Sequence, residues 1–221
     1  MARLSRLVVP GVPHHITQRG NRGLPVFFSE ADYQTYKALL AEWCAKAGTE
    51  VWAYCLMPDH VHLILTPSHE DGLRAALGET HRRYTSQVNA REGWHGHLWQ
   101  GRFSSFPMDE AHVMACAHYI EVNPVRAKLV KRPGDWAWSS AAAHLSGRDD
   151  ALVKLAPLLD RAADWESFLA GAPDEAVNAR IRSHQRTGHP LGSAAFLDQI
   201  SARLGRNVRP AARGRPARVK P

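Results

Sequence analysis

Cysteine is scarce in this sequence, and a long apolar run is missing from it. The three cysteines, Cys44, Cys55 and Cys116, form no C-x-x-C pair. An odd number without that spacing argues against a disulfide framework and a zinc ribbon, and it fits a reducing compartment. No apolar run approaches the roughly 20 residues that cross a bilayer, and residues 1–15 are too poor in apolar side chains for a secretory signal. We therefore expect a cytoplasmic protein with no membrane partner.

Acidic residues are scarce near the end of the chain. Residues 180–221 hold ten basic and one acidic side chain, residues 148–179 hold three and seven, and residues 1–147 hold 15 and 13. The net charge of residues 180–221 is therefore +9, which exceeds the net charge of +7 of the whole chain. Basic blocks of this kind are typical of segments that contact a polyanion. We predict three parts: a domain over 1–147, an acidic helical segment and a basic, partly flexible extension.

Hydrophobic residues make up 44% of the chain, enough for a core, and their periodicity predicts an α+β domain. The predicted strands are residues 14–19, 51–57, 61–66 and 98–106, and the predicted helices are residues 30–47, 72–89 and 109–123. Hairpin-linked strands between long helices favour an antiparallel sheet covered by helices, the ferredoxin-like or split βαβ plan. Beyond this domain, the pattern predicts a helical piece within 150–178 and a short amphipathic helix over 193–204.

Two histidines open the predicted strand that follows Pro58. Because alternate residues of a strand share a face, the imidazoles of His60 and His62 lie together while Val61 points the other way. Two neighbouring imidazoles can clamp a divalent metal ion. The alternative is that both histidines simply face solvent. The apolar run that follows favours a rigid metal site, although the motif is too short to decide by itself.

A tyrosine and an asparagine lie one turn apart near the end of the third predicted helix. Tyr119 and Asn123 are i,i+4 neighbours on one helix edge. Beside a metal ion, a tyrosine oxygen can act as a nucleophile, and an amide oxygen can be a third, hard ligand. The alternative is that Tyr119 is an aromatic residue at the core boundary and that Asn123 caps the helix before Pro124. This segment alone favours the alternative.

Four segments together resemble the HUH single-tyrosine transposases, and most of all the REP-associated tyrosine transposases. The segments are HHITQRGN (14–21), AYCLMPDHVHLIL (53–65), GHLWQGRF (96–103) and YIEVNPVRAKLV (119–130). The resemblance covers about residues 5–145 and is much more specific than the two histidines alone. It implies an antiparallel sheet that carries the histidines, a neighbouring helix that carries the nucleophile, and cleavage and rejoining of single-stranded DNA.

The resemblance also implies the roles of individual residues. His60 and His62 match the HUH pair, Tyr119 matches the catalytic tyrosine, and Asn123 stands where the family has a polar third ligand, often glutamine. Mg²⁺ or Mn²⁺ held by these three ligands would keep positions open for phosphate oxygens. The Tyr119 oxygen would form a 5′-phosphotyrosine and release a 3′-OH, and a second 3′-OH could reverse the step without ATP. With one catalytic tyrosine per chain, either a homodimer or one chain acting sequentially would exchange two DNA ends.

Basic, polar and aromatic residues near the expected site are candidates for DNA contact, because arginines bind phosphates and rings stack on bases. They are Arg19, Arg22, Arg82, Arg83, Trp99, Gln100, Arg102 and Arg126. In the basic extension, the candidates are Arg206, Arg213 and Arg215. The tail either enters an A·T-rich minor groove or contacts phosphates without sequence preference, and the second interpretation is favoured.

The sequence therefore predicts a metal-dependent transposase or nickase for single-stranded or hairpin DNA, with residues 1–147 as its catalytic domain. Two alternatives stay open. One is a domesticated sequence-specific DNA-binding protein or regulator with little cleavage. The other is a metal-dependent hydrolase whose nucleophile is water, in which cleavage would survive the substitution Tyr119→Phe.

Overall fold

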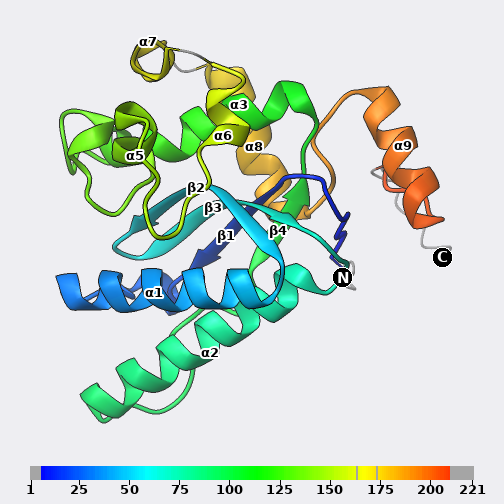
Figure 1. Ribbon diagram of the computed structural model, residues 1–221. Helices are drawn as coiled ribbons and strands as arrows, with labels where there is room; N and C mark the ends of the chain where they lie inside the picture. Colours follow the sequence, from blue (N-terminus) through cyan, green and yellow to red (C-terminus); the bar gives the residue numbers. More distant parts are fainter. Residues whose placement is uncertain (1–5, 163, 173, 210–221) are drawn as a thin grey trace, which may run out of the picture.

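A four-stranded antiparallel sheet lies at the centre of the computed structural model, which describes residues 6–162, 164–172 and 174–209 (Figure 1). The strands are β1 (His14–Arg19), β2 (Thr49–Met57), β3 (His60–Pro67) and β4 (Ser104–Pro107). Their order across the sheet is β2-β3-β1-β4, and all three pairings are antiparallel. The predicted fold class is confirmed.

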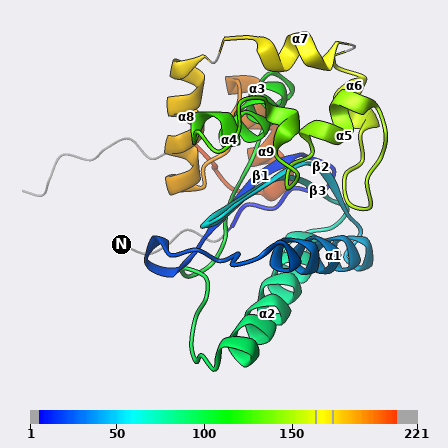
Figure 2. The same cartoon turned by 90° about the vertical axis from the view of Figure 1, so that its left-hand side faces the viewer.

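Helices cover both faces of the sheet (Figures 1 and 2). One face packs on α1 (Glu30–Lys46) and α2 (Gly72–Glu92). The other face packs on α3 (Glu110–Glu121) and on shorter helices that follow it. These are α4 (Asn123–Arg126), α5 (Ala141–Ser146), α6 (Ala156–Leu159), α7 (Trp165–Ala170) and α8 (Glu175–Thr187). Two short 3-10 turns, η1 (Asn21–Gly23) and η2 (Pro133–Asp135), and the C-terminal helix α9 (Ala194–Leu204) complete the described elements.

The alternation along β3 divides its side chains between the two cores. Leu63 and Leu65 point to the cluster under α1 and α2, whereas Ile64 points to the cluster under α3. His60 and His62 have the same parity as Ile64, so they face α3. The period-two pattern of this strand therefore aims both histidines at the helix that carries Tyr119.

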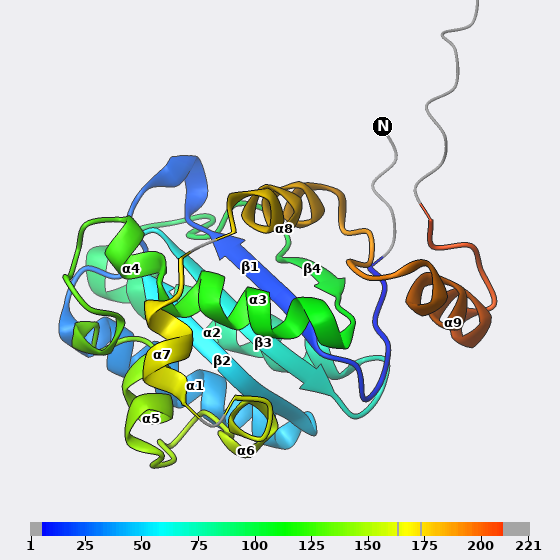
Figure 3. The ribbon, with the colours of Figure 1, turned by 90° about the horizontal axis from the view of Figure 1, so that it is seen from above.

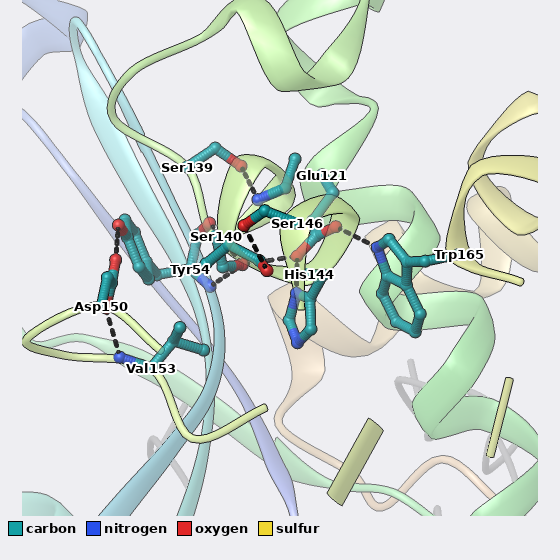
Figure 4. Close-up of polar contacts among 11 residues, drawn as sticks. Tyr54, Glu121, Ser139, Ser140, His144, Ser146, Asp150, Val153 and Trp165 are labelled. Carbon is teal, nitrogen blue, oxygen red and sulfur yellow. Dashed lines mark hydrogen bonds and ion pairs between the residues drawn. The ribbon is translucent and has the colours of Figure 1, made fainter. Parts of the chain in front are cut away.

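A buried carboxylate anchors the end of α3 (Figure 4). Glu121 is fully buried, and its Oε1 accepts hydrogen bonds from Ser140 Oγ at 2.5 Å and from His144 Nδ1 at 2.6 Å. Its Oε2 accepts one from the indole nitrogen of Trp165 at 2.9 Å. Because a buried carboxylate is stable only when it is fully hydrogen-bonded, this network fixes α3 against the chain that follows it.

The structure differs from the predicted elements around residues 98–106. The predicted fourth strand is shortened to Ser104–Pro107, and the residues before it form a loop. Gly101 has a φ of +61°, which interrupts extended backbone, and Gln100 N donates to Arg19 O at 2.8 Å. The predicted third helix likewise ends at Glu121, and Asn123 begins the separate helix α4, in which Pro124 takes an early position that needs no N–H.

The basic extension packs on the domain as far as Val208. Leu191 N donates to Pro107 O at 2.9 Å, and Asp109 N donates to Leu191 O at 3.1 Å, beside the end of β4. The predicted helix over 193–204 is confirmed as α9, which lies beside the N-terminal segment (Figure 3). Its Ile200 packs in a third apolar cluster with Leu7, Val9 and Val208. Within the described ranges, no helix is long and apolar enough to span a membrane.

Candidate active site

The two strand histidines lie at the start of β3, next to one another and mostly buried. Their ring centroids are 4.9 Å apart, with the ring planes nearly perpendicular at 88°. His62 is 3% exposed, and the side chain of His60 is 13% exposed. In the neighbouring strand β1, Thr17 lies opposite His62 and Arg19 lies opposite His60. The pair therefore lies on an inner strand, at one end of the sheet.

Each of these histidines has its Nδ1 held by another side chain. His60 Nδ1 lies 2.6 Å from Asp59 Oδ1, and His62 Nδ1 lies 3.1 Å from His15 Nε2. When each Nδ1 carries the proton and donates it to its neighbour, the Nε2 lone pairs stay available for a metal ion. Among the described residues, His62 Nε2 has no hydrogen-bond partner, whereas His60 Nε2 lies 3.4 Å from the Asn123 amide nitrogen.

The electrostatics of the site favour neutral imidazoles at His62 and His15 and an ionised Asp59. Burial lowers the pKa of His62 well below its ordinary value, and nearby cationic groups add to this effect. Burial lowers the pKa of His15 to about 3. The hydrogen bond with His60 holds the pKa of the Asp59 carboxyl below its usual range. A neutral imidazole next to a carboxylate acceptor is the state in which histidine binds a metal.

Tyr119 comes from the other layer and stands over the histidines. Its ring centroid lies 5.6 Å from that of His62, at 89°, and 6.4 Å from that of His15. The guanidinium carbon of Arg126 lies 4.4 Å from the centre of the Tyr119 ring. Tyr119 is 5% exposed. Helix α3 thus places a phenol, and helix α4 an arginine, beside the two histidines.

Asn123 reaches the same site from α4. Its amide nitrogen lies 3.4 Å from His60 Nε2, and its Oδ1 accepts a hydrogen bond from Arg126 Nη2 at 3.5 Å. A half-turn of the amide about its Cβ–Cγ bond would present the oxygen to His60 instead. No group of three or more His, Cys, Asp or Glu side chains in the described ranges could hold a metal ion. A three-ligand site here therefore needs the Asn123 amide, and two imidazoles with one amide oxygen suit a divalent cation.

Asp59 and His15 were not assigned a role from the sequence, yet both contact the histidine pair. Asp59 immediately precedes His60, so a local signal existed in the sequence. His15 is 47 residues from His62, and only the register of β1 against β3 brings them together. The sequence signal for His15 was its place in a polar HHITQR strand, in which a buried histidine needs a partner.

The candidate DNA-contacting residues divide by position. Arg126 lies in the site, and Arg19 ends β1 beside His60. Arg22 is exposed in η1, with a left-handed φ of 59°, and Gln100 is exposed beside Arg19. These residues surround one end of the sheet near the histidines.

The remaining candidates lie elsewhere. Arg82 and Arg83 are on α2, which covers the other face of the sheet, and both pair with Glu79. Trp99 is 6% exposed and packs against Tyr36, Tyr84 and His81, in the core rather than on a DNA-facing surface. Arg102 is exposed just before β4, and Arg206 lies beside the N-terminal segment. Arg213 and Arg215 lie outside the described residues.

Known proteins are similar to this chain in sequence. The family model described as "Transposase IS200 like" matches residues 10–123, just over half of the chain. A REP-associated tyrosine transposase of Escherichia coli is 28% identical over 123 residues, which cover 55% of this chain and 68% of the relative. A putative REP-associated tyrosine transposase of Haemophilus influenzae is 25% identical over 116 residues, which cover 48% of this chain and 66% of the relative.

A solved structure supports the fold independently. The structure of a REP-associated tyrosine transposase bound to a REP hairpin superposes with a TM-score of 0.54 at 21% identity, and it covers 68% of this chain and 90% of that one. The resemblance to REP-associated tyrosine transposases is thus confirmed. The chain belongs to the family of IS200-like transposases, enzymes that cleave DNA.

Proposed function

We propose that this chain cleaves and rejoins single-stranded or hairpin DNA through a covalent bond to Tyr119, with a divalent metal ion bound beside it. The observation that carries the proposal is the convergence of His60, His62, Tyr119 and Asn123 from three elements on one site. The hairpin bound by the similar solved structure supports a hairpin substrate. Bacterial relatives and three free, buried cysteines are consistent with activity in the bacterial cytoplasm.

The residues of the chain divide the work. Mg²⁺ or Mn²⁺ would be held by His60, His62 and Asn123, and when bound it polarises a phosphate. Asp59 and His15 keep the imidazoles of His60 and His62 oriented. The Arg126 guanidinium, next to the Tyr119 ring, can contact a phosphate oxygen.

The proposed cleavage is an in-line displacement at phosphorus. The Tyr119 oxygen forms a bond to phosphorus as its proton is lost, and the bond to the 3′ oxygen breaks. That oxygen takes up a proton and leaves as a 3′-OH, while the 5′ phosphate stays on the tyrosine. A 3′-OH that attacks the phosphotyrosine reverses these steps and rejoins DNA, because the energy of the broken bond is kept in the new one.

The test uses a hairpin oligonucleotide with single-stranded flanks, incubated with Mg²⁺ or Mn²⁺ and resolved on a denaturing gel. We expect wild-type protein to form a covalent adduct with the 5′-phosphate side of the cut and Tyr119→Phe to form none, while both bind the DNA. Cleavage that survives Tyr119→Phe but not His60→Ala would instead assign water as the nucleophile. Binding without any adduct by wild type would favour the DNA-binding regulator.

The number of chains in the reaction is a separate part of the proposal. With one catalytic tyrosine per chain, the exchange of two DNA ends requires a homodimer or two successive cleavages by one chain. Sedimentation equilibrium of the protein with and without the hairpin distinguishes these two schemes.

A further inference from the structure

The outer edge of β4 borders a basic cleft that the transposase site does not use. The cleft has a volume of about 670 Å³ and is lined by residues 102–105, by residues 185–189 at the end of α8, and by residues 206–209 after α9. Arg6 and Leu7 close its N-terminal side. We propose that this cleft is a second phosphate-binding site, which holds the backbone of the DNA substrate away from the scissile phosphate. The inference rests on the proposed function.

The charge of the cleft points to an anion. Five arginines line it and no acidic side chain does; they are Arg6, Arg102, Arg186, Arg206 and Arg209. Arg209 is paired with Asp198 at 2.7 Å. Arg102 and Arg186 are exposed, and neither has an ion-pair partner in the part of the chain that the structure describes. Guanidinium groups without acidic partners are the usual ligands of DNA phosphates.

Two buried polar atoms supply an independent indication. Ser105, which is 4% exposed, and Gln185 both line the cleft. Ser105 Oγ and Gln185 Nε2 are buried, and neither has a hydrogen-bond partner among the described residues. A buried polar atom without a partner costs about 1–3 kcal/mol, so native sites usually provide one. Phosphate oxygens would accept hydrogen bonds from both atoms and from the arginines.

The sheet links this cleft to the active site. Ser104 lies opposite Thr17 in the β1–β4 pairing, and Thr17 lies opposite His62 in the β1–β3 pairing. Two strand spacings, about 10 Å, therefore separate β3 from β4. Ser104 Oγ also donates to the backbone oxygen of Gln185, which ties the cleft wall to the strand. The cleft would therefore hold a phosphate within a few nucleotides of the scissile one.

The cleft depends on the C-terminal extension. Residues 185–189 and 206–209 form two of its walls, and both lie beyond residues 10–123, which match the family model. Figure 3 shows α8 beside β4 and α9 near the N-terminal segment. The extension thus adds a DNA-binding surface to a domain whose residues 1–147 carry almost balanced charge.

The first experiment measures the affinity for the hairpin oligonucleotide by fluorescence anisotropy over a series of salt concentrations. For the double variant Arg102→Ala and Arg186→Ala we expect about tenfold weaker binding at low salt and a salt slope reduced by roughly two. Arg148→Ala is the matched control, because Arg148 is an exposed arginine two residues before Asp150, which accepts a hydrogen bond from Tyr54 of β2, the edge strand opposite β4. Replacement of both cleft arginines by lysine should restore the slope.

The second experiment separates hydrogen bonding from charge and locates the phosphate. Gln185→Ala should weaken binding without changing the salt slope. A neutral methylphosphonate is placed at one position after another within a few nucleotides of the cut, and at one of these positions it should weaken binding by wild type but not by the double arginine variant. Competition by inorganic phosphate alone, with no effect of any methylphosphonate, would assign the cleft to free anions rather than DNA.

Two results keep this proposal distinct from the proposed cleavage. If wild type forms the Tyr119 adduct but the double arginine variant, still folded by circular dichroism, binds DNA with the wild-type slope, the cleft proposal is wrong and the cleavage proposal stands. If wild type forms no adduct but loses affinity and slope with the arginines, cleavage is wrong and the cleft stands.

Discussion

His15 Nε2 lies 3.1 Å from Nδ1 of His62, across the pairing of β1 with β3. The imidazole of His15 is buried against Phe106 and Tyr119, at ring distances of 5.1 and 6.4 Å. This neighbour can fix both the tautomer and the orientation of a metal-binding histidine. His15 is therefore a positioning residue, because it acts through His62 rather than through the metal ion or DNA.

The substitution His15→Ala should weaken metal binding more than DNA binding. Loss of an outer partner of a metal ligand typically lowers metal affinity or activity about 10- to 100-fold. A titration of adduct formation with Mn²⁺ should therefore need more metal, while the affinity for the hairpin in the absence of metal stays unchanged. His15→Gln, which keeps an acceptor, should restore part of the effect. His95→Ala, at an exposed histidine, is the control. A metal dependence that is unaffected by His15→Ala would show that the contact is only structural.

Two substitutions test whether the side-chain oxygen of Asn123 is a metal ligand. Asn123→Asp retains an oxygen at the position next to His60 and adds a charge, so we expect metal affinity equal to or above that of wild type. Asn123→Ala removes the oxygen, and we expect adduct formation to need at least about tenfold more metal than in wild type. Isothermal titration of the protein with Mn²⁺ gives a readout independent of cleavage. Equal Mn²⁺ affinity of all three proteins would assign Asn123 to helix capping instead.

The sequence predicted which strand and helix carry the site residues much better than it predicted where those helices end and which side chains are buried. The period of two residues along β3 was sufficient to put His60 and His62 on one face, because this period is a local property of any strand. The separation of Asn123 onto its own helix was not visible, since Tyr119 and Asn123 have the spacing of one continuous helix. Trp99 sits in the segment GHLWQGRF, whose resemblance to a transposase motif suggested a DNA contact, yet its burial in the core with α1 and α2 can be known only from packing.

Long-range pairing explains the other differences. The contact of His15 with His62 depends on strand register over 47 residues. Helix α8 was missed because few apolar residues mark it; Val177 is partly buried, and Ile181 is fully buried. Its ends do carry local signals, an N-terminal cap at Asp174 and Gly188 with φ of +73°. The docking of Val208 beside Leu7 and Val9 had no local signal at all.

Removal of the Glu121 carboxylate should destabilise the fold and impair cleavage together. Glu121→Ala leaves the donors of His144 and Trp165 buried without their acceptor, while Ser140 Oγ keeps only Tyr54 O, so we expect a loss of about 3 kcal/mol or more in the free energy of unfolding. Glu121→Gln should lose less, because an amide oxygen still accepts. Urea unfolding gives the stability, and adduct formation at low temperature shows whether the displaced end of α3 also misplaces Tyr119. Wild-type stability of Glu121→Ala would contradict the anchoring role.

Acid should destabilise the protein through His14. Its Nε2 accepts the backbone N–H of Val9 at 3.2 Å, and its Nδ1 donates to Val12 O at 2.7 Å, so the folded chain needs a neutral ring. Burial lowers the pKa of His14 to about 4. Below an ordinary histidine pKa of about 6.5, the unfolded chain binds a proton that the folded chain does not, so stability falls as the pH drops toward 4.

The size of this effect can be measured directly. Between about pH 7 and pH 5, His14 should account for a loss on the order of 2 kcal/mol in the free energy of unfolding, and His14→Gln should remove that share of the pH dependence. Urea unfolding at several pH values gives both numbers. A variant with the full wild-type pH dependence would assign the acid sensitivity to other groups.

Two truncations should separate the structural part of the extension from its basic end. A chain that ends at Arg209 keeps Val208, the Arg203 bond to Pro10 O and the whole cleft, but it loses Arg213, Arg215, Arg218 and Lys220. We expect unchanged stability, and a salt slope of DNA binding lower by as much as about 3, if all four side chains contact phosphates.

A chain that ends at Leu204 also loses Val208 and the cleft wall at 206–209, so its free energy of unfolding should fall by about 1–2 kcal/mol. Thermal melting and salt-dependent anisotropy on the same hairpin distinguish the two chains. An unchanged slope after the first truncation would mean that the basic end makes no phosphate contact, and equal melting of both chains would contradict the packing role of Val208.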